Sequence, residues 1–265
     1  MGGASMNYAR VKYELRGQVA IVAMNDPETL NAVSEGMGDE LLHAVDRAQR
    51  EARALVISTA VRGFCSGANL ATATVDLADP QRDVGALLET HFNPLLLRLR
   101  GSTIPVLTAV RGAAAGIGAS IALCADIIVA AESAYFYMAF SRVGLVPDGG
   151  AAYLLSRAIG RVRALEMMLL GEKLYARKAF EWGLVTRLVP DEELDAAALQ
   201  LATQLAQGPR SIGMIRQAAW DALDLSLQEQ LTRERDLQRA AGRTTDFLEG
   251  VAAFRERRAA RFKGE

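Results

Sequence analysis

The stretch that decides the fold is PVLTAVRGAAAGIGASIALCADIIVAAE, residues 105–132. It opens with a short apolar run, PVLTAV, of the kind that forms a strand covered on both faces. A glycine-rich turn, GAAAGIG at residues 112–118, leads into a small-sided helical segment, ASIALCA, and then into a second apolar run, DIIVAAE. Strand, turn, helix and strand in this order predict parallel pairing in an α/β protein, with ligands at the carboxyl ends of the strands.

The segments before this stretch follow the same plan. Two β-rich runs, VKYEL from Val11 and VAIVAMN from Val19, predict a hairpin. Ser34 is the expected N-cap of a helix that ends near Arg50. The run ALVIST, residues 54–59, predicts another buried strand, and an amphipathic helix is expected over residues 81–100.

The character of the chain changes after Gly208-Pro209. From there the sequence carries only helical patterns, and it becomes strongly basic near its end. We therefore expect two parts, an α/β core over residues 1–208 and a helical region over residues 209–265.

Composition excludes several classes of function. The 265 residues carry a formal net charge of -1, which gives no sign of a nucleic-acid partner. Cys65 and Cys124 are far apart and lack the spacing of a metal site or a disulfide framework, so we expect no metal and a reducing compartment. No secretory signal and no apolar run of about 20 residues is present, which predicts a cytoplasmic protein with no membrane partner.

One acidic residue stands in an unusual place. From Gly101 to Gly160 the only acidic residues are Asp126, Glu132 and Asp148, and Asp148 lies in GLVPDGG between a proline and two glycines. Two interpretations are open for it. Asp is a favoured helix N-cap, and a scarce carboxylate in an apolar setting is also a candidate acid/base group.

Two glycine-containing loops, residues 62–68 and 112–118, each follow a predicted strand. Such turns leave backbone N–H groups free to point at an oxygen atom without an intervening side chain. Two N–H groups aimed at one point would form an oxyanion hole. The alternative is that these glycines only allow a strand and a helix to pack closely.

Five motifs resemble the enoyl-CoA hydratase/isomerase, or crotonase, family. This resemblance implies a crotonase-like spiral of ββα units with a C-terminal helical trimerisation region, and a homotrimer or a hexamer formed as a dimer of trimers. It assigns acyl-CoA binding and catalysis to the core and oligomerisation to the helical region. The motifs are GFCSGANL (residues 63–70), AVRGAAAGIGASIALCADI (109–127), Leu30-Asn31-Ala32, FSRVGLVPDGG (140–150) and EWGLVTRLV (181–189).

The resemblance also implies the roles of individual residues. The thioester carbonyl of an acyl-CoA would lie between the backbone N–H groups of Ala68 and Ile117, which would stabilise an enolate. CoA is then part of the substrate, and no further cofactor is implied. Ala32, Ser66 and Phe140 fall at substrate-binding positions. Phe262 and Lys263 would reach the adenine and a phosphate of CoA bound to a neighbouring subunit.

Hydratases of this family use two glutamates, and the corresponding positions here carry Ser120 and Phe140. Neither residue is a carboxylate base, so Asp148 becomes the expected single base of an isomerase. It would take a proton from one carbon and return it to another, and burial would raise its pKa toward the working pH. Ser120 lacks the second glycine of a hydrolase elbow, and Gly116-Ile117-Gly118 lacks the third glycine of a dinucleotide fingerprint.

Within the family, FNPLLLRL, MAFSRVGLVPDGG and ERDLQRAAGR are most similar to the ring-1,2-epoxyphenylacetyl-CoA isomerases of phenylacetate catabolism. That subgroup opens a ring epoxide and also shifts double bonds. Three alternatives stay open: a hydratase-like enzyme, a non-catalytic acyl-CoA-binding scaffold, and a 4-chlorobenzoyl-CoA dehalogenase-like enzyme. The dehalogenase would use Asp148 as nucleophile together with His91, whereas His43 is expected to be structural.

Overall fold

The structure, a computed structural model, describes residues 7–69 and 78–265. Its centre is a six-stranded sheet with the strand order β1-β2-β3-β4-β6-β9, in which only the β1–β2 hairpin is antiparallel. The strands of this sheet are β1 (Val11–Arg16), β2 (Val19–Met24), β3 (Ala54–Thr59), β4 (Val106–Val110), β6 (Ile127–Ala131) and β9 (Arg187–Val189). The predicted hairpin, the buried strands and their parallel pairing are therefore confirmed.

A second sheet of three strands lies beside the first. It consists of β5 (Ala113–Ala115), β7 (Tyr135–Tyr137) and β8 (Lys173–Tyr175), with β5 parallel to β7 and β8 antiparallel to it. The sequence analysis placed a single turn over residues 112–118, and that expectation is wrong. The first three residues after Gly112 pair with β7, and a helix begins at Ile117, so the turn contracts to Gly116.

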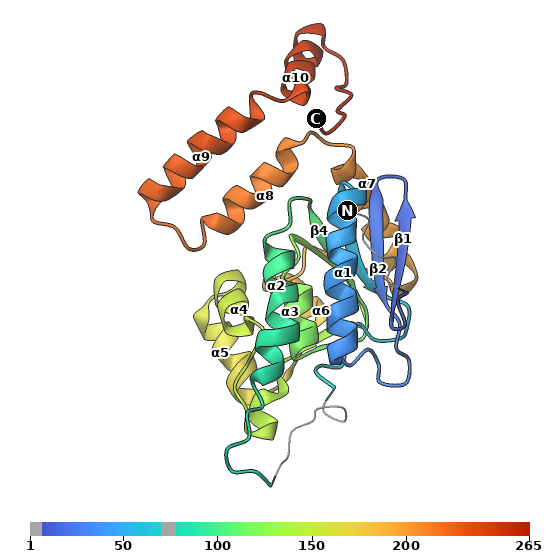
Figure 1. Cartoon of the computed structure of the whole chain (residues 1–265), viewed down its shortest axis with the longest axis vertical. Coiled ribbons are helices and arrows are strands. Elements are labelled where there is room, and N and C mark those ends of the chain that lie inside the picture. The colour runs from blue at the N-terminus through green and yellow to red at the C-terminus, as the bar shows by residue number, and fades with distance from the viewer. Residues whose placement is uncertain (1–6, 70–77) are drawn as a thin grey trace.

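Helices cover both faces of the large sheet (Figure 1). One face packs against α1 (Glu35–Glu51), α2 (Asn93–Arg100) and α3 (Ile117–Leu123), and the other face packs against α7 (Leu194–Ala206). Ser34 accepts a hydrogen bond from the N–H of Met37, which confirms it as the N-cap of α1. The remaining helices of the core are α4 (Ala151–Ile159), α5 (Arg161–Leu170) and α6 (Ala176–Glu181), with short η2 (Ala139–Val143) and η3 (Asp191–Glu193).

The helix expected over residues 81–100 is partly wrong. The π-helical segment η1 (Leu88–Phe92) precedes α2, and residues 81–85 lie in turns and irregular structure. Pro94 explains the change of register, because proline has no N–H for an i→i−4 bond within a continuous helix. The N–H of Asn93 instead bonds to the carbonyl of Leu88, five residues earlier.

The chain after Gly208-Pro209 forms α8 (Ser211–Asp221), α9 (Leu227–Ala241) and α10 (Thr245–Glu256). In Figure 1, α9 and α10 extend away from the sheets. Helix α8 lies next to the core, and its Gly213 approaches the carbonyl of Thr103 so closely that a side chain at this position would collide with it. The sequence boundary between two domains at residue 208 stays a prediction.

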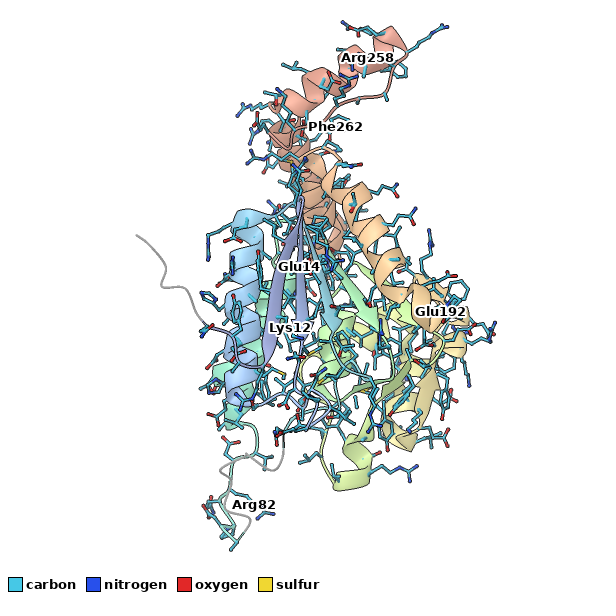
Figure 2. All side chains as sticks on the ribbon, turned by 90° about the vertical axis from the view of Figure 1, so that its right-hand side faces the viewer. Lys12, Glu14, Arg82, Glu192, Arg258 and Phe262 are labelled. Atoms are coloured by element: carbon cyan, nitrogen blue, oxygen red, sulfur yellow. The ribbon has the colours of Figure 1, made fainter. Side chains whose placement is uncertain are left out.

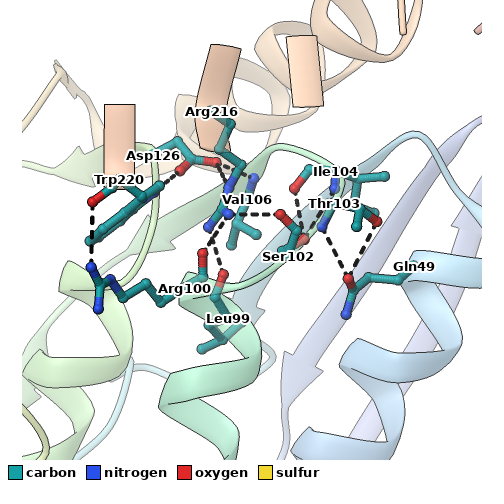
Figure 3. Close-up of polar contacts among 10 residues, drawn as sticks. All are labelled: Gln49, Leu99, Arg100, Ser102, Thr103, Ile104, Val106, Asp126, Arg216 and Trp220. Carbon is teal, nitrogen blue, oxygen red and sulfur yellow. Dashed lines mark hydrogen bonds and ion pairs between the residues drawn. The ribbon is translucent and has the colours of Figure 1, made fainter. Parts of the chain in front are cut away.

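Arg216 is the main polar link between α8 and the core (Figure 3). Its guanidinium donates to the carbonyl oxygens of Leu99 (2.6 Å), Arg100 (2.6 Å) and Ser102 (2.8 Å), and so satisfies acceptors at the end of α2. It also donates to Asp126 Oδ2 at 2.7 Å. Asp126 accepts further bonds from the Val106 N–H and the Trp220 indole, both at 2.7 Å.

We expect Arg216→Met to lower the free energy of unfolding by about 3–5 kcal/mol, because removal of one partner leaves a largely buried carboxylate and several carbonyls without a donor. Urea unfolding followed by circular dichroism measures this loss. Arg239→Met is the matched control, since Arg239 and its partner Asp236 are about half exposed and such pairs contribute less than about 1 kcal/mol. Equal losses in the two variants would contradict the assigned role of Arg216.

Candidate active site

Asp148 is the one acid of its region for which the structure provides no cation. Of the three acidic residues between Gly101 and Gly160, Asp126 is paired with Arg216 at 2.7 Å and Glu132 with Arg177 at 3.4 Å. Oδ1 of Asp148 is buried without a hydrogen-bond partner among residues 7–69 and 78–265. Burial raises the pKa of Asp148 to about 6, which gives this carboxylate the properties of a base near neutral pH.

The turn around Asp148 has a left-handed backbone at its two glycines. Gly149 and Gly150 both adopt positive φ, +56° and +74°, and Gly150 is the N-cap of α4. The cap position is thus held by a residue without a side chain. The main-chain carbonyl of Asp148 accepts the N–H of Ala151 at 3.0 Å, but its carboxylate is not the cap of α4, so the interpretation of Asp148 as an N-cap is wrong.

The two glycine loops lie against each other. Cys65 forms a parallel bridge with Ala114, in which its N–H bonds to the carbonyl of Ala113 at 2.8 Å and its own carbonyl accepts the N–H of Ala115 at 2.9 Å. Further along, a Cβ atom on Gly116 would lie 3.7 Å from the Cα of Gly67. The residues that follow these two glycines in the chain are Ala68 and Ile117.

Ala68 and Ile117 both have backbone N–H groups that are free to bind a ligand. Ile117 is the first residue of α3, where an N–H has no intrahelical acceptor. In Ala68, the bridge to Val33 uses the carbonyl of Gly67 and the N–H of Asn69 and leaves the N–H of Ala68 unused. Neither N–H donates a hydrogen bond to any residue that the structure describes. The predicted pair of oxyanion-hole donors is therefore available.

The Asp148 turn packs directly onto the first turn of α3. A Cβ atom on Gly149 would lie 2.6 Å from Cδ1 of Ile117 and 3.0 Å from both Cβ and Oγ of Ser120. The ring of Phe140 lies next to Gly116, 3.7 Å from its hypothetical Cβ position. The structure thus gathers Phe140, Ile117 and the Asp148 turn around one helix N-terminus, with the Gly67–Ala68 loop beside it.

The segment that carries Ala32 is hydrogen-bonded to the loop that carries Ser66. Ser66 donates from its N–H to the carbonyl of Leu30 (3.1 Å) and from its hydroxyl to the carbonyl of Thr29 (2.8 Å). The N–H of Val33 bonds to the carbonyl of Gly67 at 2.8 Å. The buried Ala32 accordingly lies next to the candidate oxyanion loop, and the exposed Ser66 is part of that loop, directly before Gly67 and Ala68. Leu70, the last residue of the motif GFCSGANL, lies outside the described residues.

Asn31 is a structural determinant of the site to which the sequence analysis gave no role. Its side chain is fully buried; Oδ1 accepts the N–H of Asp26 (2.7 Å), while Nδ2 lies within hydrogen-bonding distance of Thr59 Oγ1, Gly63 O and Phe64 O at 2.8–3.1 Å. Leu30 and Asn31 both have positive φ, +55° and +60°. Asn is among the residues that tolerate this conformation, and that preference was the available signal.

Phe262 and Lys263 are not brought to this site within one chain. The tail folds back on α10, where the N–H of Lys263 donates to Asp246 Oδ1 at 2.7 Å and the ring of Phe262 lies next to Gly250. Figure 2 shows Phe262 with the C-terminal helices, at the end of the molecule away from Arg82. A role for the two residues at a neighbouring subunit stays a prediction.

The histidines contact other side chains. His91 Nδ1 lies 2.9 Å from Asp39 Oδ1, and Nε2 lies 3.8 Å from Glu35, both on α1. His43 Nδ1 lies 2.9 Å from the Tyr8 hydroxyl, an arrangement that fits a structural role. Within the described ranges, no group of three or more His, Cys, Asp or Glu residues is arranged to hold a metal ion, and no helix is long and apolar enough to cross a membrane.

Comparison with known proteins agrees with this geometry. Residues 14–265 match the family model for enoyl-CoA hydratase/isomerase, and the chain belongs to this family. It is 44% identical over 250 residues to a 1,2-epoxyphenylacetyl-CoA isomerase of Escherichia coli, covering 93% of this chain and 95% of that protein. It is 39% identical over 260 residues to a probable enoyl-CoA hydratase of Rhodobacter capsulatus, covering 98% and 100%.

A solved structure shows the same architecture. The crystal structure of a putative enoyl-CoA hydratase from Streptomyces coelicolor superposes with a TM-score of 0.90 at 32% identity, and the match covers 100% of this chain and 98% of that one. The predicted crotonase-like fold is confirmed, and the described part of the chain holds ten α-helices, including the C-terminal set. The protein is thus an enzyme of the hydratase/isomerase family, which acts on acyl-CoA thioesters.

The burial of Asp148 predicts a pH-dependent effect on stability. Because the folded-state pKa of about 6 exceeds the unfolded value of 3.8, the folded protein binds the proton more tightly and loses stability as pH rises through 6. Asp148→Asn does not titrate. The free energy of unfolding of Asp148→Asn minus that of wild type should therefore rise by about 1 kcal/mol from pH 5 to pH 8. This figure allows for the partial exposure of Asp148.

Urea unfolding of both proteins at the two pH values measures this change. Glu192→Gln is the control, because Glu192 is exposed on the surface (Figure 2). The free energy of unfolding of this variant should differ from that of wild type by the same amount at both pH values. A difference for Asp148→Asn that is constant with pH would show that the carboxylate is not desolvated in the folded protein.

Proposed function

We propose that this enzyme is an acyl-CoA isomerase that shifts a double bond, or opens a ring epoxide, in a CoA thioester through an enolate and with a single carboxylate base. The observation that carries the proposal is Asp148, a half-buried residue whose Oδ1 is buried without a hydrogen-bond partner in the described chain, and whose pKa burial raises to about 6. A carboxylate of this pKa removes a proton at neutral pH and still holds it long enough to return it.

The proposed reaction conserves every atom of the substrate. Asp148 takes a proton from the carbon next to the thioester carbonyl, and the N–H groups of Ala68 and Ile117 donate to the enolate oxygen. The protonated Asp148 then returns the proton to a carbon further along the conjugated system, so the double bond moves and the carboxylate is regenerated. Each backbone donor would contribute about 2.7–4 kcal/mol to the lowering of the barrier.

The surrounding residues have supporting roles in this proposal. Phe140, next to Gly116, offers an apolar wall, and Ala32 and Ser66 lie beside the Gly67–Ala68 loop where the thioester would enter. The double-bond shift is a proton transfer within the substrate, so this proposal requires no metal and no cofactor beyond the CoA of the substrate. We place the enzyme in the cytoplasm, and its epoxyphenylacetyl-CoA isomerase relative supports a role in the catabolism of aromatic acids.

Hydration of an enoyl-CoA is the second candidate, because one relative is a probable enoyl-CoA hydratase. The residues at the two motif positions argue against it. Ser120 and Phe140 supply no carboxylate to hold and activate water, and Ser120 is buried with its hydroxyl directed at the main chain of Asp148. A dehalogenase that uses His91 is disfavoured by the contacts of His91 with Asp39 and Glu35.

Asp148→Asn is expected to lower kcat for 3-enoyl-CoA isomerisation by at least about 1,000-fold while CoA thioester binding stays within about twofold, because only the proton transfer is lost. In wild type, kcat/KM should fall below pH 6 as the carboxylate becomes protonated. The ultraviolet absorbance of the conjugated product measures the rate, and calorimetry with a non-reactive thioester measures binding.

Retention of wild-type activity by Asp148→Asn would reject Asp148 as the base. Thioester binding without isomerisation or epoxide opening by wild type would favour the scaffold, and hydration of crotonyl-CoA as the main reaction would favour the hydratase. Halide release from 4-chlorobenzoyl-CoA, with an ester on Asp148 detected by mass spectrometry, would favour the dehalogenase.

We further propose that the enzyme is a homotrimer, or a hexamer made of two trimers, assembled through its C-terminal helices. Large apolar side chains are exposed on α8–α10, among them Ile215, Leu227, Leu248 and Phe254, with Phe254 86% exposed. An apolar groove of about 490 Å³ lies between α8 and α9 and is lined by Met214, Leu231 and Leu237. Such patches are characteristic of protein interfaces.

Light scattering should give three or six times the chain mass of 28.5 kDa. Phe254→Asp should reduce that mass, because it places a charge in the proposed interface. Leu15→Asp is the control, since Leu15 is 46% exposed on the edge strand β1 and should leave the mass unchanged. A monomeric wild type would refute the proposed assembly.

A further inference from the structure

Ser120 forms a hydrogen bond to the Asp148 turn that has no role in the proposed reaction as described above. It is fully buried in α3, and its hydroxyl donates to the main-chain carbonyl of Asp148 at 3.3 Å, its one hydrogen-bond acceptor among residues 7–69 and 78–265. A serine inside a helix commonly bonds to the carbonyl four residues earlier. Here the N–H of Ser120 makes the usual helical bond to the carbonyl of Gly116 at 3.2 Å, while the hydroxyl donates to the Asp148 turn.

The same helical turn carries the candidate oxyanion donor. Ile117 and Ser120 are neighbours on one face of α3, three residues apart, and both contact Gly149. The Asp148 turn therefore packs on the side chains of Ile117 and Ser120 of α3. The N–H of Ile117, the first residue of this helix, is the one that would bind the enolate oxygen. Since the backbone of Gly149 is at φ +56° and offers no Cβ, the turn lies closer to α3 than any other residue would allow.

We infer that Ser120 is a positioning residue for Asp148: its hydroxyl fixes the 148–150 turn against the first turn of α3 and so sets the place of the carboxylate relative to the oxyanion donor Ile117. This inference rests on the proposed function. It gives a role to the residue that replaces a hydratase glutamate. The small side chain of Ser120 allows the Asp148 turn to approach α3 closely. The hydroxyl of Ser120 then donates to the main-chain carbonyl of Asp148.

The contact has a consequence for the acidity of Asp148. Its carbonyl receives two donors, the Ser120 hydroxyl and the Ala151 N–H at 3.0 Å, and these hold the residue so that Oδ1 stays buried. Without the hydroxyl, the carbonyl of Asp148 keeps only the local bond to Ala151, and packing of Gly149 on α3 is left to hold the turn, so the carboxylate is freer to rotate toward water. The pKa of Asp148 would then fall toward its ordinary value, because burial is what raises it.

The test uses Ser120→Ala in the full-length enzyme with a 3-enoyl-CoA substrate. We expect kcat to fall about tenfold with KM changed less than twofold, and the acid limb of the kcat/KM profile to move to lower pH by at least half a unit. A purely structural hydroxyl would lower the unfolding midpoint without moving the acid limb.

Thr108→Val is the matched control. Thr108 is also fully buried, and its hydroxyl donates to a carbonyl of the same helix, that of Ala122, at 3.2 Å, but it does not contact the Asp148 turn. This variant should lose a similar amount of stability and keep the wild-type kcat and acid limb. If Ser120→Ala has the kinetics of Thr108→Val while Asp148→Asn is inactive, the positioning role is refuted and the proposed function stands. If Asp148→Asn is active, the proposed function itself fails.

Discussion

The structure of the candidate site depends on close contact between backbone segments around the first turn of α3. Gly118 packs against Cys65 with no room for a side chain, Gly116 approaches Gly67, and Gly149 rests on Ile117 and Ser120. At Gly118 and Gly149 a Cβ atom would collide with the neighbouring segment, and at Gly116 and Gly149 glycine is also favoured because φ is positive. The site is thus built from main-chain groups, whose places are fixed by packing.

The distribution of charge complements this packing. Arg216 from the helical region pairs with Asp126, and Arg177 pairs with Glu132, whereas Asp148 has no ion pair among the described residues. A carboxylate with a nearby cation would have a low pKa and would be a weak base. The isolation of Asp148 is therefore a property of the whole region and is not visible in the turn alone.

Much of this arrangement could be predicted from the sequence, and the failures have physical causes. The buried strands over residues 54–59 and 105–110 are signalled by continuous apolar runs, and Ser34 marks the start of α1 by its capping chemistry. The short strand β5 was missed because Ala113–Ala115 has little strand propensity, and its pairing with β7 decides its conformation. The role of Asn31 was missed because three of its four side-chain contacts are with residues 28 to 33 positions away in sequence, and only Asp26 is near, at five positions.

The contact of Arg216 with the end of α2 has a consequence for the biosynthesis of the chain. The carbonyls of Leu99, Arg100 and Ser102 and the carboxylate of Asp126 belong to the core, but their common donor is encoded more than 80 residues later. When only the two sheets have emerged from the ribosome, the carbonyls at the end of α2 therefore lack their Arg216 donor and bond to water. The bonds of Arg216 to these core groups can form only after α8, which begins at Ser211, has emerged, so about the last fifth of the chain completes contacts of the core that precedes it.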